Sequence, residues 1–134
     1  SSLGCNVLIG DLQPPPPSLP KEIGFLRTDL TDYSALLALF DQCKTTFGTY
    51  PDLVFANAGI GECGELFAGV SDAEIRVEPK HEVLDLDLKA TANTIRLAWW
   101  GMKKEGIKGS IVVTASLAGY AGAGITMYVL PPLP

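Results

Sequence analysis

Three short runs of apolar, largely β-branched residues decide what this chain of 134 residues can fold into. They are "CNVLIG" (Cys5–Gly10), "DLVFA" (Asp52–Ala56) and "SIVVTA" (Ser110–Ala115), and a weaker fourth run is "IGFLR" (Ile23–Arg27). Apolar residues follow one another in these runs instead of alternating with polar ones, which is typical of parallel strands buried on both faces. The runs therefore predict a parallel sheet of about four strands, covered by helices.

Two amphipathic segments lie between these runs and predict helices. The first carries an apolar stripe from Tyr33 to Phe47, with Thr31 as a suitable N-cap and Gly48 as a suitable left-handed residue at its end. The second covers about residues 81–106 and has an apolar stripe of Leu84, Leu88, Ile95, Trp99 and Met102. Strands connected by helical crossovers predict a doubly wound α/β fold.

Composition excludes several classes of function. The net charge is −5 and lysine and arginine do not cluster, which argues against nucleic acid and membrane surfaces as partners. Three widely spaced cysteines indicate reduced thiols and a cytoplasmic location. His81 begins half of an H-E-x-x-H motif, but Asp85 stands where the second histidine is needed, so no metal site is expected.

The stretch "LQPPPPSLP" (Leu12–Pro20) cannot form a helix or an interior strand, because proline lacks an N–H group and has a fixed φ. It predicts an extended polyproline II connector. Two interpretations stay open for it, a stiff surface loop or a ligand for an SH3 or WW domain.

Polar residues follow the ends of the apolar runs. They are Asp11, Asp29, Asn57 and Ser116. In open α/β sheets, ligands bind outside the carboxyl ends of the strands, so these side chains are candidates for a common site. Asp11 either starts a turn or accepts hydrogen bonds from a ribose. The glycines of "ANAGIGECG" (Ala56–Gly64) allow a cofactor to approach the backbone closely.

Together the motifs "NVLIGD", "RTDLTD", "FANAG" and "GSIVVTASLAGYAG" resemble those of the short-chain dehydrogenase/reductase family. Tyr128, twelve residues after Ser116, has the spacing that is typical of the family's active-site tyrosine. The resemblance implies an incomplete Rossmann-like domain over residues 1–134 that lacks the central first strand, with residues 129–134 as a tail unlike the family. By this resemblance the cofactor-binding residues are Asp11, Asp29, Asn57, Ala58 and Gly59.

The resemblance also implies catalytic roles. Ser116 would hold the substrate oxygen, Tyr128 would be the general acid/base, and Asp87 stands where the family has an asparagine. Pro132 occupies the place of the family's lysine, and the T-G-x-x-x-G-x-G loop is missing from these residues. We therefore expect the chain by itself to be inactive, as part of a truncated or frame-shifted sequence.

The implied reaction is hydride transfer between a nicotinamide cofactor and a small alcohol or carbonyl substrate. NAD is expected over NADP, because the carboxylate of Asp11 would repel a 2′-phosphate and no arginine follows before Arg27. A full-length relative is expected to form a homo-oligomer. The alternatives are a non-catalytic relative of the family or a proline-rich module that binds WW or SH3 domains.

Overall fold

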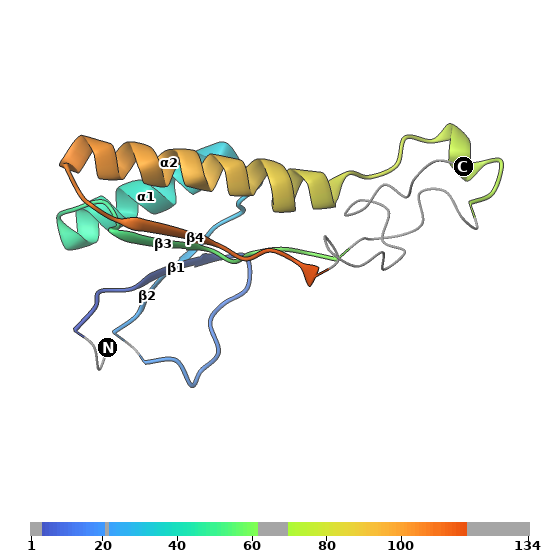
Figure 1. The fold of residues 1–134 in the computed structure, drawn as a ribbon. Helices are drawn as coiled ribbons and strands as arrows, with labels where there is room; N and C mark the ends of the chain where they lie inside the picture. Colours follow the sequence, from blue (N-terminus) through green and yellow to red (C-terminus); the bar gives the residue numbers. More distant parts are fainter. Residues whose placement is uncertain (1–3, 21, 62–69, 118–134) are drawn as a thin grey trace.

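The computed structural model describes residues 4–20, 22–61 and 70–117. The strands are β1 (Leu8–Asp11), β2 (Gly24–Arg27), β3 (Leu53–Ala56) and β4 (Ser110–Val113), and the long helices are α1 (Tyr33–Phe47) and α2 (Thr91–Glu105). A short 3₁₀ turn (Glu74–Arg76) and a π-helical segment (Leu84–Ala90) precede α2. Figure 1 shows strands running in one direction beneath two helices, which confirms the predicted α/β class.

The strands pair in two separate parallel sheets. β1 pairs with β2, and β3 pairs with β4, while no ladder joins β1 to β3 in the described part of the chain. A gap in a parallel sheet is therefore confirmed at the place where the resemblance puts the absent first strand. The predicted run Cys5–Gly10 was placed too early, because β1 begins at Leu8 and includes Asp11 as its last residue.

Both predicted helices form, and both end at a glycine in the left-handed region. Gly48 has φ 79° and Gly106 has φ 68°, values that residues with a Cβ rarely adopt. The predicted N-cap Thr31 was wrong, since Asp32 caps α1 through a 2.8 Å hydrogen bond from the Ser34 N–H to its Oδ1. Thr31 is engaged elsewhere, because its hydroxyl donates to Asp29.

The proline-rich stretch forms the loop between β1 and β2. The Leu19 N–H donates to the Pro16 carbonyl oxygen at 2.9 Å, so a turn over residues 16–19 lies within the stretch and includes two of its prolines. The polyproline II prediction thus misses this turn. An i to i+3 hydrogen bond is incompatible with a continuous polyproline II helix, which has no internal hydrogen bonds.

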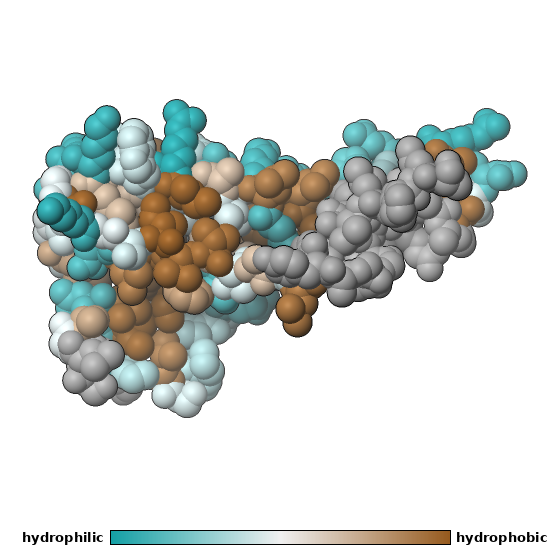
Figure 2. Space-filling model, viewed as in Figure 1, coloured by the Kyte–Doolittle hydropathy of each residue, from teal (hydrophilic) through white to brown (hydrophobic). Residues whose placement is uncertain are grey.

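The two long helices cover one face of the strands and leave the other face bare (Figure 1). Leu53 and Phe55 on β3 point to the bare face, where 60% and 62% of their surfaces are exposed. Figure 2 shows apolar residues gathered in a band that runs from α2 across the strands. The described part of the chain therefore leaves part of its apolar surface uncovered.

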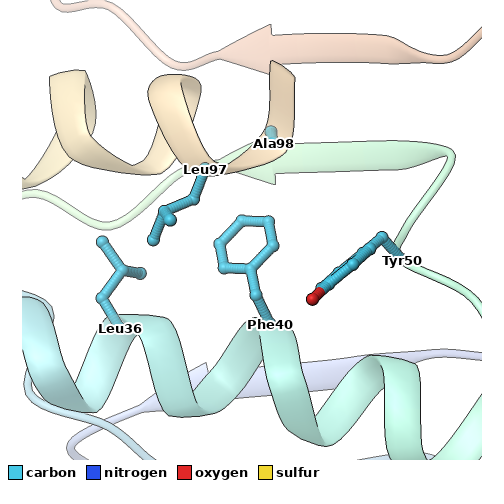
Figure 3. Close-up of a cluster of buried hydrophobic side chains, with 5 residues drawn as sticks. All are labelled: Leu36, Phe40, Tyr50, Leu97 and Ala98. Atoms are coloured by element: carbon cyan, nitrogen blue, oxygen red, sulfur yellow. The ribbon is translucent and has the colours of Figure 1, made fainter. Parts of the chain in front are cut away.

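The core lies between the helices and β3 (Figure 3). It consists of Leu36, Phe40, Tyr50, Leu97 and Ala98. The bulky stripe predicted for the second helix mostly faces away from this core, as Leu88 and Trp99 show with 65% and 57% exposure. The buried face of α2 consists of Leu97, Ala98, Gly101 and Met102, so Met102 is the one member of the predicted stripe that is buried. A Cβ on Gly101 would lie 3.0 Å from the Tyr50 side chain, so the absence of a side chain at this position lets α2 approach Tyr50 closely.

Candidate cofactor and active site

Asp11 lies at the carboxyl end of β1 with an exposed side chain. Its Oδ1 accepts a 2.8 Å hydrogen bond from the Gln13 N–H, and its backbone oxygen accepts from the Thr28 N–H of the β2 end. The turn that sequence reasoning considered for this acid therefore exists. Among the described residues its Oδ2 accepts no hydrogen bond, so the turn does not prevent the carboxylate from accepting from a ribose hydroxyl.

Asp29 follows β2 and is held as an ionised acceptor. Its Oδ1 accepts from the Thr31 hydroxyl at 2.7 Å and from the Thr31 N–H at 3.0 Å. These hydrogen bonds, first that of the hydroxyl and then that of the backbone, lower the pKa of the Asp29 carboxyl below its ordinary value. Asp29 and Asp11 thus place two carboxylates at the carboxyl ends of neighbouring strands.

A side-chain hydrogen bond joins the segments that follow β3 and β4. The Thr114 hydroxyl donates to Asn57 Oδ1 at 2.7 Å, and the Thr114 N–H donates to the Ala56 carbonyl oxygen at 3.0 Å. Ser116 follows two residues later and is exposed. The bonds to Thr114 bring together two segments with predicted site residues, Asn57–Gly59 and Ser116. Both segments lie at the carboxyl ends of β3 and β4.

The π-helical segment brings Asp87 to the loop after β3. Asp87 Oδ1 accepts from the Ile60 N–H at 3.0 Å, and a Cβ on Gly59 would lie 3.4 Å from the same oxygen. The loop therefore contacts the carboxylate at a place where glycine leaves room. This contact gives Asp87 a positioning role on the loop, while a direct part in catalysis stays a prediction.

Sequence reasoning missed two partners of the site, Thr114 and Ile60. It also missed the π-helical segment, which is of a kind often found at functional sites. One signal was present in the sequence, because the alternation of Leu84, Leu86 and Leu88 does not fit a regular helical stripe. Tyr128 and the tail 129–134 lie outside the described residues.

Comparison with known proteins decides the family. A family model described as short chain dehydrogenase matches residues 9–129. The chain belongs to this family. It is 38% identical to the short-chain dehydrogenase/reductase ascJ of Acremonium egyptiacum over 122 residues, which are 87% of this chain and 41% of that protein. The chain thus spans about two-fifths of the length of the curated relatives it matches first.

Other matches agree with the family. A 2,5-dichloro-2,5-cyclohexadiene-1,4-diol dehydrogenase of Sphingobium indicum is 33% identical over 73% of this chain and 37% of its own length. The crystal structure of a short chain dehydrogenase from Leptospira borgpetersenii with bound NAD+ has a TM-score of 0.71 at 22% identity, covering 91% of this chain and 46% of that one. The crystal structure of carveol dehydrogenase from Mycobacterium avium in complex with NAD has a TM-score of 0.67 at 22% sequence identity. The match covers 92% of this chain and 50% of that one. These structures confirm the fold.

Two further observations concern the residues that the structure describes. They contain no cluster of three or more histidine, cysteine, aspartate or glutamate side chains that could hold a metal ion. None of their helices is both long and apolar enough to cross a lipid bilayer.

Proposed function

We propose that the protein to which these residues belong transfers hydride between a nicotinamide cofactor and a small alcohol or carbonyl substrate. The observation that carries this proposal is the gathering of polar groups at the carboxyl ends of parallel strands, where α/β sheets bind ligands. Asp11 and Asp29 lie at one pair of strands, and Asn57 and Ser116 lie at the other. The family and the diol dehydrogenase among the relatives support the reaction class.

The residues present fit the adenosine side of the cofactor. The exposed carboxylate of Asp11 suits a ribose hydroxyl pair, and its negative charge disfavours a 2′-phosphate. Leu12 and Gln13, which follow, carry no positive charge that would compensate. NAD is therefore the proposed cofactor, and when bound it supplies or receives the hydride.

The loop after β3 forms the second part of the proposed site. Gly59 lacks a side chain that would keep a ligand away from the backbone, and the Thr114 and Asp87 bonds described above hold the first part of the loop at Asn57 and Ile60. A held loop limits the conformational entropy that binding would cost. Asn57, Ala58 and Gly59 are thus proposed to line the cofactor.

On the substrate side, Ser116 is proposed to donate a hydrogen bond to the reacting oxygen, and Tyr128 to exchange a proton with it. Asp87 is proposed to act through the loop that it contacts. Pro132 in the place of the family's lysine favours a second candidate, a relative that binds cofactor without turnover. In the first candidate a proton is transferred to or from the substrate oxygen. In the second candidate no proton is transferred.

The experiment joins this chain to the remaining segments of an active relative, including a Y-x-x-x-K continuation, and follows NADH absorbance with that relative's substrate. Tyr128→Phe is expected to lower kcat by about 10²–10⁴-fold, the usual value of general acid/base catalysis. Ser116→Ala is expected to lower kcat by about 10²–10³-fold, the usual loss when one hydrogen-bond donor to the reacting oxygen is removed. Lys108→Ala, at an exposed site before the start of β4 and therefore at the end of this strand opposite to Ser116, is the control and should leave kcat unchanged. Full activity of Tyr128→Phe would contradict the proposed chemistry, and cofactor binding without turnover would favour the second candidate.

A further inference from the structure

A groove lies between α1 and α2, which run side by side above the strands (Figure 1). It has a volume of about 340 Å³ and is open to solvent. Only one of the residues that line it is charged, and the other five are apolar or aromatic. The lining residues are Tyr33, Leu37, Arg96, Leu97, Trp99 and Trp100. None of them is a candidate cofactor or active-site residue, so the groove is not part of the site described above.

The bottom of the groove belongs to the core. Leu97 is buried in the core cluster, and Leu37 packs against that cluster. The aromatic residues stand around it in contact with water, since Tyr33 is 42% exposed and Trp100 is 38% exposed. All the lining residues lie on the two helices, whose backbones hold them in place. An apolar ligand would therefore remove aromatic surface from water without a rearrangement of the core.

The guanidinium of Arg96 has no counter-charge in the part of the chain that the structure describes. The two helices contain two acids, Asp41 and Glu105. Glu105 pairs with Lys44 at 2.8 Å, and Asp41 accepts a 3.3 Å hydrogen bond from the Tyr50 hydroxyl. The other described ion pairs lie outside these helices and do not include Arg96. The guanidinium is thus available to an anion in the groove.

Two lysines add positive charge beside the tryptophans. The Lys103 Nζ lies 4.9 Å from the centre of the Trp99 ring, and the Lys104 Nζ lies 4.8 Å from that of Trp100. Together with Arg96 they give α2 three basic residues against one acid, in a chain whose net charge is −5. An apolar groove with positive charge at its border is complementary to a molecule that has an apolar body and one anionic end.

We propose that the groove between α1 and α2 binds a small apolar carboxylate. Arg96 holds the carboxylate, because a guanidinium can donate two parallel hydrogen bonds to its oxygens. The apolar body of the ligand lies on Leu37 and between the aromatic rings. Ligand pockets usually measure about 300–1,000 Å³, so the size of this groove indicates a small ligand. The inference goes beyond the proposed hydride transfer and does not depend on it.

Intrinsic fluorescence tests the proposal, because Trp99 and Trp100 are the only tryptophans of the chain and both line the groove. The 134-residue chain is titrated with octanoate, and with 1-octanol as the matched ligand without a charge. Octanoate is expected to shift the emission to shorter wavelength in a saturable way, with a Kd of about 1 mM or tighter. Octanol should bind about fivefold more weakly, the upper value for a partly exposed ion pair. A change without saturation, or equal binding of the two ligands, would overturn the proposal.

A set of variants assigns the preference for octanoate to one side chain. Arg96→Met removes the charge and keeps an unbranched chain, so it should weaken octanoate binding about fivefold and leave octanol binding unchanged. Arg96→Lys keeps a charge and should retain part of the preference. Lys108→Met is the matched control at an exposed position outside the groove, and should bind both ligands as the parent does. A preference for octanoate that survives Arg96→Met, or equal losses in Arg96→Met and Lys108→Met, would contradict the assignment.

A second copy of the chain is the competing occupant of the groove. Sedimentation velocity and tryptophan emission are therefore measured at several protein concentrations, with and without octanoate. Emission that does not depend on protein concentration supports the proposal, whereas self-association that shifts the emission and prevents the octanoate effect overturns it. The titrations are repeated with this chain joined to the segments of an active relative, in which tryptophans are replaced by phenylalanine. The preference for octanoate must be the same there, and its absence would refute the proposal even if the shorter chain does not fold.

Discussion

At the scale of single residues, position in the fold outweighs residue type. Phe40 and Phe55 are the same amino acid, yet Phe40 is 4% exposed in the core and Phe55 lies on the bare face of β3. Asp29 and Asp11 are both acids at the ends of strands, yet only Asp29 accepts from a side-chain hydroxyl. These differences lead to two measurable contrasts.

Phe40→Ala is expected to lower the free energy of unfolding by about 3–5 kcal/mol, because it removes a buried ring and leaves a cavity between α1, α2 and β3. The same substitution at Phe55 should cost less than about 1 kcal/mol, since that ring is mostly in water. Urea unfolding followed by circular dichroism measures both. Equal losses would show that the ring of Phe55 is buried in solution.

Thr31→Val is expected to raise the pKa of Asp29 toward its ordinary value, because it removes the hydroxyl that stabilises the carboxylate. Thr31→Ser keeps the hydroxyl and should keep the low pKa. A pKa that is depressed in the folded state adds stability above the unfolded pKa, and this stability is lost as the pH falls through the folded pKa. Thr31→Val should therefore destabilise the protein at neutral pH and converge with the parent in acid, as NMR titration and unfolding at several pH values will test.

At the scale of elements, hydrogen bonds at both ends of α1 fix where this helix begins and ends. Asp32 caps its first turn, and Lys44 in its last turn donates to the Gly48 carbonyl oxygen and pairs with Glu105 of α2 at 2.8 Å. The Lys44–Glu105 pair links the C-terminal ends of the two helices. Because it is partly exposed, we expect the cap to contribute more than the ion pair does.

Asp32→Ala is expected to lower the free energy of unfolding by about 1 kcal/mol, the usual value of an N-cap. Asp32→Asn retains an oxygen that can accept from the Ser34 N–H, and should restore most of the loss. Thermal unfolding of the three proteins at one pH makes the comparison. A loss in Asp32→Asn as large as in Asp32→Ala would mean that the charge, and not the cap, stabilises α1.

Sequence patterns predicted the four strands and the two long helices in their order, because local signals decide them. The β-branched run at Ser110–Val113 and the glycines at Gly48 and Gly106 belong to this class. The side of α2 that is buried was not predictable from its stripe, since it depends on the fit of Gly101 against Tyr50, which is remote in sequence. The hydrogen-bond partners in the site were not predictable for the same reason, because they are remote in sequence. Thr114 and Asn57 are 57 residues apart, and Asp87 and Ile60 are 27 residues apart.

At the scale of the whole molecule, the described residues contain two pairs of parallel strands that α1 packs against, and no described ladder joins the two pairs. The groups that would meet a dinucleotide are divided in the same way. Asp11 and Asp29 lie on the β1–β2 half, while Asn57 and Gly59 lie beyond the end of β3. A ligand that needs both halves should therefore bind weakly to these 134 residues alone.

NAD is expected to bind the 134-residue chain with a Kd of about 1 mM or weaker, which corresponds to about 4 kcal/mol. Pyrophosphate is usually held by a glycine loop at a helix N-terminus, and the first turn of α1 is instead occupied by the Asp32 cap. AMP, which lacks the nicotinamide half, should bind within about threefold of NAD, because the groups that fit the cofactor address its adenosine side. Asp11→Ala should weaken both ligands alike. Calorimetric titration at millimolar ligand measures all four affinities, and micromolar binding of NAD, or a large advantage of NAD over AMP, would show that these residues hold the pyrophosphate after all.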